Sequence, residues 1–187
     1  YFSATPDRAS RLLDELGRRP RIRALAGTPL LLALVTLIFE QRGSLPQRRT
    51  DIYRRCVALL LHEWDAARER DRHPRFRQEH KEDFLRKTAW LLHIRGSRYI
   101  EHKEIVEQLR SFLPSIGLPE SSAPELLKEI TTHHGLVRTY DDDWYGFVHF
   151  ALQEFFAAGC IGHWEPLTTA INQRHQAWWQ EVLRLHA

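Results

Sequence analysis

One pair of strand-like segments stands in a sequence that otherwise shows helical periodicity. The segments are residues 136–140 (LVRTY) and 145–150 (YGFVHF), and the acidic stretch DDDW lies between them. Short runs of aromatic and β-branched residues around a tight polar turn predict a β-hairpin. Most of the remaining sequence is predicted to be helical, so the expected fold class is mainly α.

The elements expected before the hairpin follow a definite order. A helix through residues 84–92 is followed by an extended segment, Arg98–Ile100, and by a second helix through residues 105–112. A third helix begins at a capping box formed by Ser122 and Glu125 and ends at Gly135. Helix, strand, helix, helix and hairpin is the order of a winged-helix domain.

The first half of the chain is predicted to be a helical bundle. An apolar run, Leu30–Phe39, follows the pair Thr28-Pro29 and precedes a terminating glycine, Gly43. A helix that is apolar on most sides has to lie inside a core. Shorter helices are expected before this run and a longer one after it, over residues 6–17, residues 20–26 and a helix capped by Thr50.

These patterns divide the chain into four predicted parts. Residues 1–70 form a helical domain, residues 71–80 a charged connector, and residues 81–161 the winged-helix domain with its small β-hairpin. Residues 162–187 are expected to form C-terminal helices that begin a further region. Because the chain starts at Tyr1 and contains no methionine, we expect it to be a piece of a longer protein.

Composition and motifs argue against several functions. Lys plus Arg number 27 against 24 Asp plus Glu, so the net charge of +3 is only a weak argument for nucleic acid. No glycine is followed by lysine, so the phosphate-binding loop GxxxxGK[ST] is absent. GxSxG and HExxH are also absent, and the histidines show no metal-ligand spacing. We therefore expect neither a self-contained enzyme nor a metal site.

The expected location is the cytoplasm. The longest apolar run has ten residues, whereas a helix needs roughly 20 to cross a bilayer. No basic leader or small-residue cleavage site accompanies the run. Cys56 and Cys160 stand far apart without a CxxC pair, which favours buried free thiols in a reducing compartment.

Two local groups remain as candidates for a functional site, Gly27-Thr28-Pro29 and His149. Alternation along the second hairpin strand predicts that His149 ends this strand just before a helix. A helix start offers free backbone N–H groups and a positive dipole end, and a histidine there can donate to a phosphate oxygen. The residues alone also allow a simpler interpretation, in which His149 is a satisfied surface histidine and the triplet only punctuates two helices.

Together these groups resemble the NACHT family of signal-transduction NTPases, within the STAND class of ATPases. Residues 24–61 (ALAGTPLLLALVTLIFEQRGSLPQRRTDIYRRCVALLL) look like the family's helical domain, in which a Gly-x-Pro triplet leads into a Leu-rich helix. Residues 145–158 (YGFVHFALQEFFAA) are similar to its motif F-x-H-x-x-x-Q-E-F/Y-x-A at the end of the winged-helix domain.

The resemblance implies a nucleotide site shared with an upstream P-loop domain. Pro29 would contact the adenine of ADP, Gly27 beside Thr28 would allow close approach, and His149 would hydrogen-bond the β-phosphate. The winged-helix domain would then be a latch, meaning a part that closes over ADP and opens when ATP, with its Mg²⁺, replaces it. The opened parent NTPase would form homo-oligomers in response to a C-terminal sensor region, and bacterial antiviral defence, a form of innate immunity, fits such a family. This piece alone is not expected to bind ADP or ATP tightly.

Two alternatives use no nucleotide. A DNA-binding winged helix would place the helix before the hairpin in the major groove, but that helix carries Glu125 and Glu129 against Lys128. The turn Asp141–Asp143 would repel phosphates, so we do not expect nucleic acid to bind through the wing. The other alternative is a helical protein-interaction scaffold, which the arginine-rich segment Arg68–Arg77 would fit.

Overall fold

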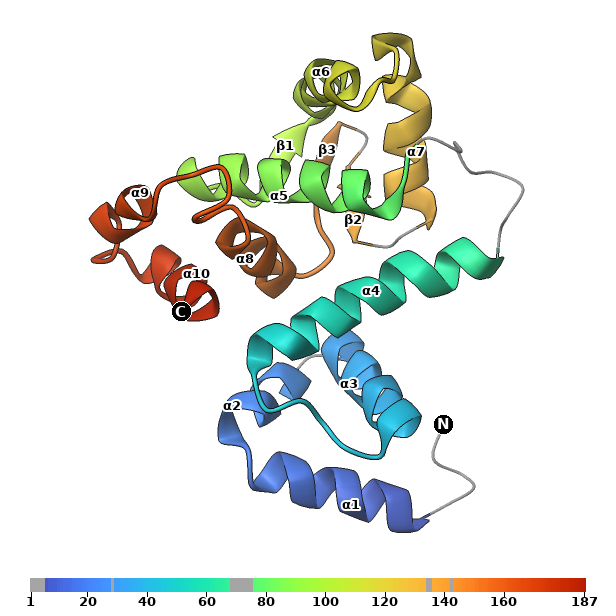
Figure 1. Ribbon diagram of the computed structural model, residues 1–187, viewed down its shortest axis with the longest axis vertical. Helices are drawn as coiled ribbons and strands as arrows, with labels where there is room; N and C mark the ends of the chain where they lie inside the picture. Colours follow the sequence, from blue (N-terminus) through green and yellow to red (C-terminus); the bar gives the residue numbers. More distant parts are fainter. Residues whose placement is uncertain (1–5, 28, 68–75, 134–135, 142) are drawn as a thin grey trace. The chain divides into compact units, whose positions relative to one another are not determined.

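The computed structural model describes residues 6–27, 29–67, 76–133, 136–141 and 143–187 (Figure 1). The chain divides into two compact units, residues 1–59 and residues 60–187. Several predicted features lie outside the described residues: Thr28, Gly135, Asp142, and residues 71–75 of the connector.

Among the residues that the structure describes, the first unit contains helices and no strand. They are α1 (Pro6–Gly17), α2 (Pro20–Arg23), the 3₁₀ helix η1 (Leu25–Gly27), α3 (Pro29–Arg42) and the first part of α4 (Arg49–Ala67). The apolar helix α3 buries Leu31, Leu34, Val35, Ile38 and Phe39, as its composition predicts. Gly43 follows α3 with φ +70°, the left-handed conformation that favours glycine at a helix end.

Two details of the first unit differ from the predictions. The helix expected over residues 20–26 is split into α2 and η1, and Gly27 is the last residue of η1 without a positive φ. Gly27 is therefore not a left-handed C-cap glycine. Thr50 is not the cap of α4, because the N–H of Ile52 already donates to the carbonyl of Arg48 and starts the helix earlier.

The second unit has the predicted winged-helix order. Its elements are α5 (Gln78–Ile94), β1 (Tyr99–Glu101), α6 (His102–Phe112), η2 (Leu113–Ile116), η3 (Glu120–Ser122), α7 (Ala123–His133), β2 (Val137–Tyr140), β3 (Trp144–Phe147) and α8 (Phe150–Ala158). The strands form an antiparallel sheet in the order β1-β3-β2. The predicted mainly α class with a winged-helix domain is confirmed, and the extended segment before α6 is the third strand of the sheet.

A glycine allows β1 to lie close to β3. Gly146 is paired with Tyr99, and a Cβ atom on Gly146 would lie 2.7 Å from the carbonyl oxygen of Arg98. Real side chains essentially never come that near a backbone atom, so a larger residue would force the segment before β1 away from β3. Gly146 thus sets the position of Arg98 beside the end of the hairpin.

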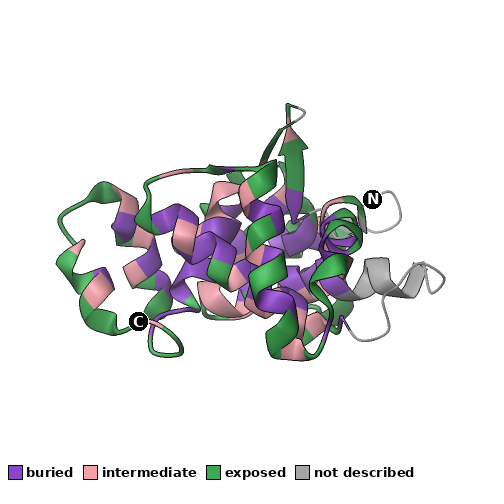
Figure 2. Cartoon of the chain, turned by 90° about the horizontal axis from the view of Figure 1, so that it is seen from above, coloured by how far each residue is buried: buried purple, intermediate pink, exposed green. Residues whose placement is uncertain are grey.

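Helix α8 is the centre of the packing in the second unit. It lies along α5 on one side and against α10 (Ala177–His186) on another, and α9 (Leu167–Asn172) contacts α10 (Figure 1). Buried positions form stripes along the helices that alternate with exposed ones (Figure 2). Leu152, Phe156, Ala157, Trp179 and Val182 contribute to this core.

Both cysteines are buried and free, as predicted. Burial raises the pKa of the Cys56 thiol to about 12, and burial likewise raises the pKa of Cys160 to about 12. Both thiols are therefore protonated and unreactive near neutral pH. Among the helices that the structure describes, none is long and apolar enough to cross a bilayer.

Candidate functional site

His149 is the N-cap residue of α8. Strand β3 ends at Phe147, so the prediction that His149 ends the strand is wrong by two residues. Its backbone remains extended, with φ −143° and ψ 134°, and its Nδ1 accepts a hydrogen bond from the N–H of Ala151 at 3.2 Å. Because Nδ1 is the acceptor, the proton of the neutral ring lies on Nε2. The capping bond therefore fixes the tautomer in which Nε2–H can donate.

His149 lines a small cavity of about 220 Å³ at this corner of the fold. The residues around it come from the start of β1 and the residue before it, from the ends of β2 and β3, and from the start of α8. They are Arg98, Tyr99, Tyr140, Phe147, Val148, His149, Phe150 and Gln153. None of them carries a carboxylate. The cavity thus combines an oriented imidazole with one permanent cation, a combination that suits an anion.

Arg98 supplies that cation. Its guanidinium lies 4.5 Å from the centre of the Phe150 ring, and within the described part of the chain it forms no ion pair. When a guanidinium stacks on an aromatic ring, its N–H groups point outward in the guanidinium plane and stay free to bind an oxyanion. An unneutralised arginine beside an oriented histidine favours a negatively charged ligand.

The protonation state of His149 follows from the same neighbours. Burial lowers the pKa of His149 from its ordinary value of 6.5, and the positive charge of Arg98 lowers this pKa further. The imidazole is therefore neutral at pH 7, and protonation of Nδ1 would break the capping bond. His149 therefore presents a neutral Nε2–H donor.

Gln153 holds the Arg98 segment next to α8. The side chain of Gln153 is 1% exposed, and its Nε2 donates to the carbonyl of Ser97 at 2.9 Å. Together with the close approach at Gly146, this bond fixes the residue before Arg98 against the helix that His149 caps. Gly146 and Gln153, both distant in sequence from Arg98, therefore position the backbone that carries this cationic side chain.

The other predicted site residues lie in the first unit. Gly27 is exposed, and a Cβ atom added to it would meet no atom within 4 Å. Pro29 is the exposed first residue of α3, and Thr28 lies outside the described residues. Gly27 and Pro29 are thus both accessible at the surface of the first unit. The pairing of Pro29 with His149 at one nucleotide stays a prediction.

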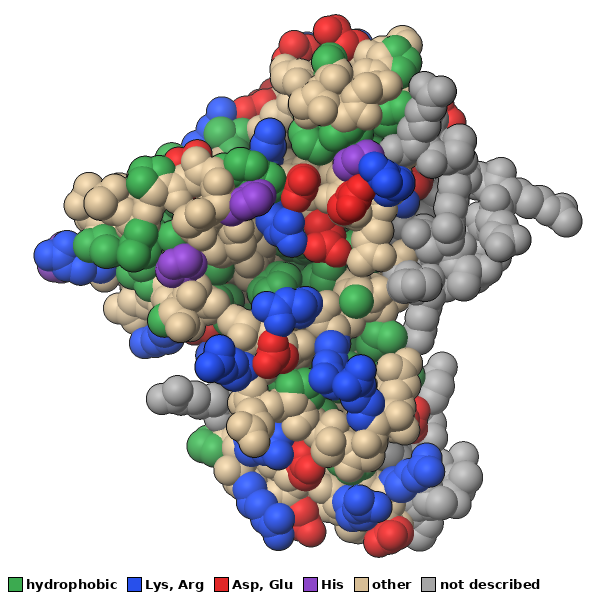
Figure 3. All heavy atoms as spheres, viewed as in Figure 1, with side chains coloured by type: hydrophobic (Ala, Val, Ile, Leu, Met, Phe, Trp, Pro, Cys, Tyr) green, Lys and Arg blue, Asp and Glu red, His purple; other side chains and the backbone are tan. Residues whose placement is uncertain are grey.

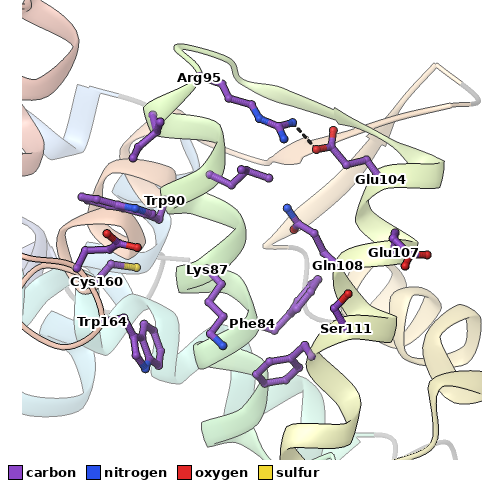
Figure 4. A pocket seen from close by; sticks show the side chains of 14 residues that line it. Phe84, Lys87, Trp90, Arg95, Glu104, Glu107, Gln108, Ser111, Cys160 and Trp164 are labelled. Carbon is purple, nitrogen blue, oxygen red and sulfur yellow. Dashed lines mark hydrogen bonds and ion pairs between the residues drawn. The ribbon is translucent and has the colours of Figure 1, made fainter. Parts of the chain in front are cut away.

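A larger groove, of about 730 Å³, lies between α5 and α6. Figure 4 shows Arg95, the residue directly after α5, reaching across one end of it to pair with Glu104 of α6. At the other end, Lys87 lies over the rings of Phe112 and Trp164, at 5.3 Å and 5.5 Å. Its lining mixes acids and bases, so the groove has no single charge preference. The smaller cavity at His149 is the better candidate because its cation is unpaired and its histidine is oriented.

The surface that a DNA-binding winged helix would use carries little positive charge. On α7, Glu125 and Lys128 are exposed, whereas Glu129 is buried and paired with Lys81, so Glu129 does not contribute to the charge of this surface. The described residues of the wing turn, Asp141 and Asp143, are exposed acids. On the face of the first unit shown in Figure 3, basic and acidic side chains are interspersed.

Sequence reasoning missed Arg98 and Gln153 as parts of the site. Gln153 stands inside the motif around His149, and Arg98 begins the predicted extended segment. The winged-helix order implies that this segment pairs with the hairpin, which would have placed Arg98 near His149. The pairing expected for a winged helix is therefore the sequence signal from which Arg98 could have been found.

Comparison with known families agrees with this fold. Residues 49–161, more than half of the chain, match the family model of a winged helix-turn-helix domain C-terminal to NACHT. The matched segment includes α4 and ends just after α8, so it contains Arg98, His149 and Gln153. No curated protein shows a significant match to the chain. By the extent of this match, the chain belongs to the family of winged helix-turn-helix domains that lie C-terminal to a NACHT domain.

Proposed function

We propose that this chain is the latch of a nucleotide switch, closing over ADP that an upstream NACHT domain holds. The upstream P-loop domain would bind ADP or ATP with Mg²⁺, and this chain would contribute His149 and the Gly27–Pro29 segment. It supplies no catalytic residue in this scheme. Exchange of ADP for ATP would open the latch, because the two nucleotides contact the winged helix differently, and the opened protein would homo-oligomerise and signal.

The observation that carries the proposal is the fixed tautomer of His149 in a cavity without carboxylates. A neutral Nε2–H beside Arg98 is suited to a phosphate oxygen, and the neutral ring retains its cap on α8. One hydrogen bond to a charged acceptor contributes about 1.5 to 3 kcal/mol. A contribution of this size biases the closed state by about tenfold to a hundredfold, so His149 would act with other contacts.

The test compares two substitutions in the full-length protein. His149→Ala removes both the ring and the N-cap, while His149→Ser keeps a capping oxygen but is too short to reach a ligand. We expect both variants to lose ADP during purification about tenfold to a hundredfold faster than the wild type and to oligomerise without stimulus. Bound nucleotide is measured by chromatography of the denatured protein, and oligomers by light scattering.

His175→Ala is the matched control, since His175 is an exposed histidine of the same unit outside the cavity. It should retain ADP as the wild type does. If His149→Ser also keeps wild-type ADP occupancy and stays equally closed, the latch role of His149 is wrong. Salt-sensitive binding of duplex DNA by the chain at micromolar concentration would favour the DNA-binding alternative.

A further inference from the structure

The cavity at His149 has a second functional side chain, and the feature that reveals it is the environment of Arg98. The guanidinium has no acidic partner among the described residues, although it lies against Phe150, directly after the N-cap of α8. Two other arginines of the unit contact acids, since Arg86 pairs with Glu82 and Asp83 and Arg95 pairs with Glu104, whereas Arg138 stacks on Tyr140 much as Arg98 stacks on Phe150. Unlike these arginines, Arg98 lines the cavity beside His149, whose lining carries no carboxylate. Arg98 is therefore placed for an anion that comes from outside the chain.

The position of Arg98 is determined by three contacts on two elements, β3 and α8. Gly146 of β3 lets its backbone approach the hairpin, and Gln153 of α8 binds the carbonyl of the preceding residue, Ser97. Phe150 supports the guanidinium from the side, at 4.5 Å. A cation fixed in this way loses little side-chain freedom when it binds a ligand. The same contacts keep it at the cavity that His149 lines.

We propose that Arg98 is a second phosphate-binding residue of this site, acting with His149 on the terminal phosphate of a nucleoside diphosphate. This inference rests on the proposed function, since it assumes that the cavity faces the nucleotide. An arginine fork binds two oxygens of one phosphate, while the imidazole Nε2–H donates to a single oxygen. The two side chains together would favour a phosphate, which offers several oxygens, over an anion that offers a single acceptor atom. The residue thus adds specificity for the diphosphate end that His149 alone would not provide.

The experiment uses the full-length protein and ADP with a fluorescent methylanthraniloyl label. Arg98→Gln removes the charge, and Arg98→Lys keeps the charge but loses the two-pronged geometry. We expect Arg98→Gln to speed release of labelled ADP about tenfold or more, and Arg98→Lys to fall between it and the wild type. Circular dichroism and thermal melting should show unchanged folding, because Arg98 is exposed.

Arg138→Gln is the matched control. Like Arg98, Arg138 is exposed and stacked on an aromatic ring, since its guanidinium lies 4.2 Å from the centre of the Tyr140 ring. Arg138 does not line the cavity. Its loss should leave ADP release unchanged, and equal effects of Arg138→Gln and Arg98→Gln would overturn the proposal in favour of a general charge effect. If His149→Ser loses ADP while Arg98→Gln retains it, the role of Arg98 is wrong and that of His149 stands. If both retain ADP, the proposed function itself is wrong.

Discussion

Two histidines of the second unit, His93 and His149, are each held in one tautomer by the backbone. The Nδ1 atom of His149 accepts from an N–H group, whereas the Nε2 atom of His93 lies 3.0 Å from the carbonyl of Trp178. A carbonyl can only accept, so the proton of His93 is also on Nε2. The two residues differ in access: His149 lines a cavity, while His93 is 0% exposed. A ligand can therefore reach His149, and His93 is a structural residue.

The burial of His93 predicts how stability depends on pH. Burial lowers the pKa of His93 from 6.5 to about 4, although the carbonyl of Trp178 opposes this shift. In the unfolded chain the ring takes up a proton near pH 6.5, but in the folded chain only near pH 4. Stability from this residue is thus complete above pH 6.5 and decreases as the pH falls toward 4, by up to about 3 kcal/mol.

The measurement is the free energy of unfolding by urea, followed by tryptophan fluorescence from pH 8 to pH 4. His93→Phe keeps an aromatic ring in the cluster but does not titrate, so it removes this pH dependence while other groups remain. The difference in the free energy of unfolding between the wild type and His93→Phe should shrink or change sign as the pH falls. A difference that stays constant over this range would contradict the assignment to His93.

Among the elements, α5 and α7 are joined by a buried ion pair. Lys81 Nζ lies 2.5 Å from Glu129 Oε1, and the two side chains are 2% and 4% exposed. Removing one partner leaves the other charge buried without compensation, which typically costs about 3 to 5 kcal/mol. We therefore expect Lys81→Met to destabilise the second unit strongly, and the double variant Lys81→Met with Glu129→Leu to destabilise it less. Urea unfolding of wild type, single and double variants measures both effects.

The exposed pair Arg110–Glu107 provides a control for this prediction. Its nitrogen and oxygen are 3.6 Å apart, and both side chains are largely exposed. Arg110→Met should cost less than about 1 kcal/mol, because water screens the pair. A cost for Lys81→Met as small as that of Arg110→Met would show that the buried pair does not stabilise the unit.

The order of helices and strands could be predicted because it depends on local signals. Apolar periodicity, prolines at helix starts and the acidic turn are each readable within a few residues, as α3 and the β2–β3 hairpin show. The composition of the candidate site could not be predicted in this way, because it depends on contacts between segments that are distant in sequence. Nothing near Arg98 indicates that β1 pairs with β3, or that Gln153 binds Ser97 from a distance of 56 residues. Element boundaries also differ by one or two residues, as the start of α4 at Arg49 and the end of β3 at Phe147 illustrate.

In the second unit as a whole, a chain of contacts links the C-terminal helix α10 to the candidate site. The Trp178 ring lies 4.6 Å from the ring of Phe150 and 5.2 Å from that of His93. Its Nε1 donates to the carbonyl of His93 at 3.0 Å, while its own carbonyl binds the ring of His93. Phe150 in turn supports Arg98. A displacement of α10 would therefore remove one support from the residue on which Arg98 stacks.

This arrangement predicts that α10 influences nucleotide retention in the full-length protein. Trp178→Ala removes the indole ring, and with it the ring contacts with Phe150 and His93 and the hydrogen bond to the His93 carbonyl. Arg98 and the start of α8 should therefore become less well fixed. We expect faster release of labelled ADP and more spontaneous oligomers, with a smaller effect than that of His149→Ser because the phosphate contacts remain. Trp164→Ala is the control, since Trp164 is 38% exposed and contacts Lys87 and His163 instead. If Trp178→Ala releases ADP no faster than Trp164→Ala, α10 is not coupled to the site, and a signal from a C-terminal sensor region would have to reach the nucleotide by another route.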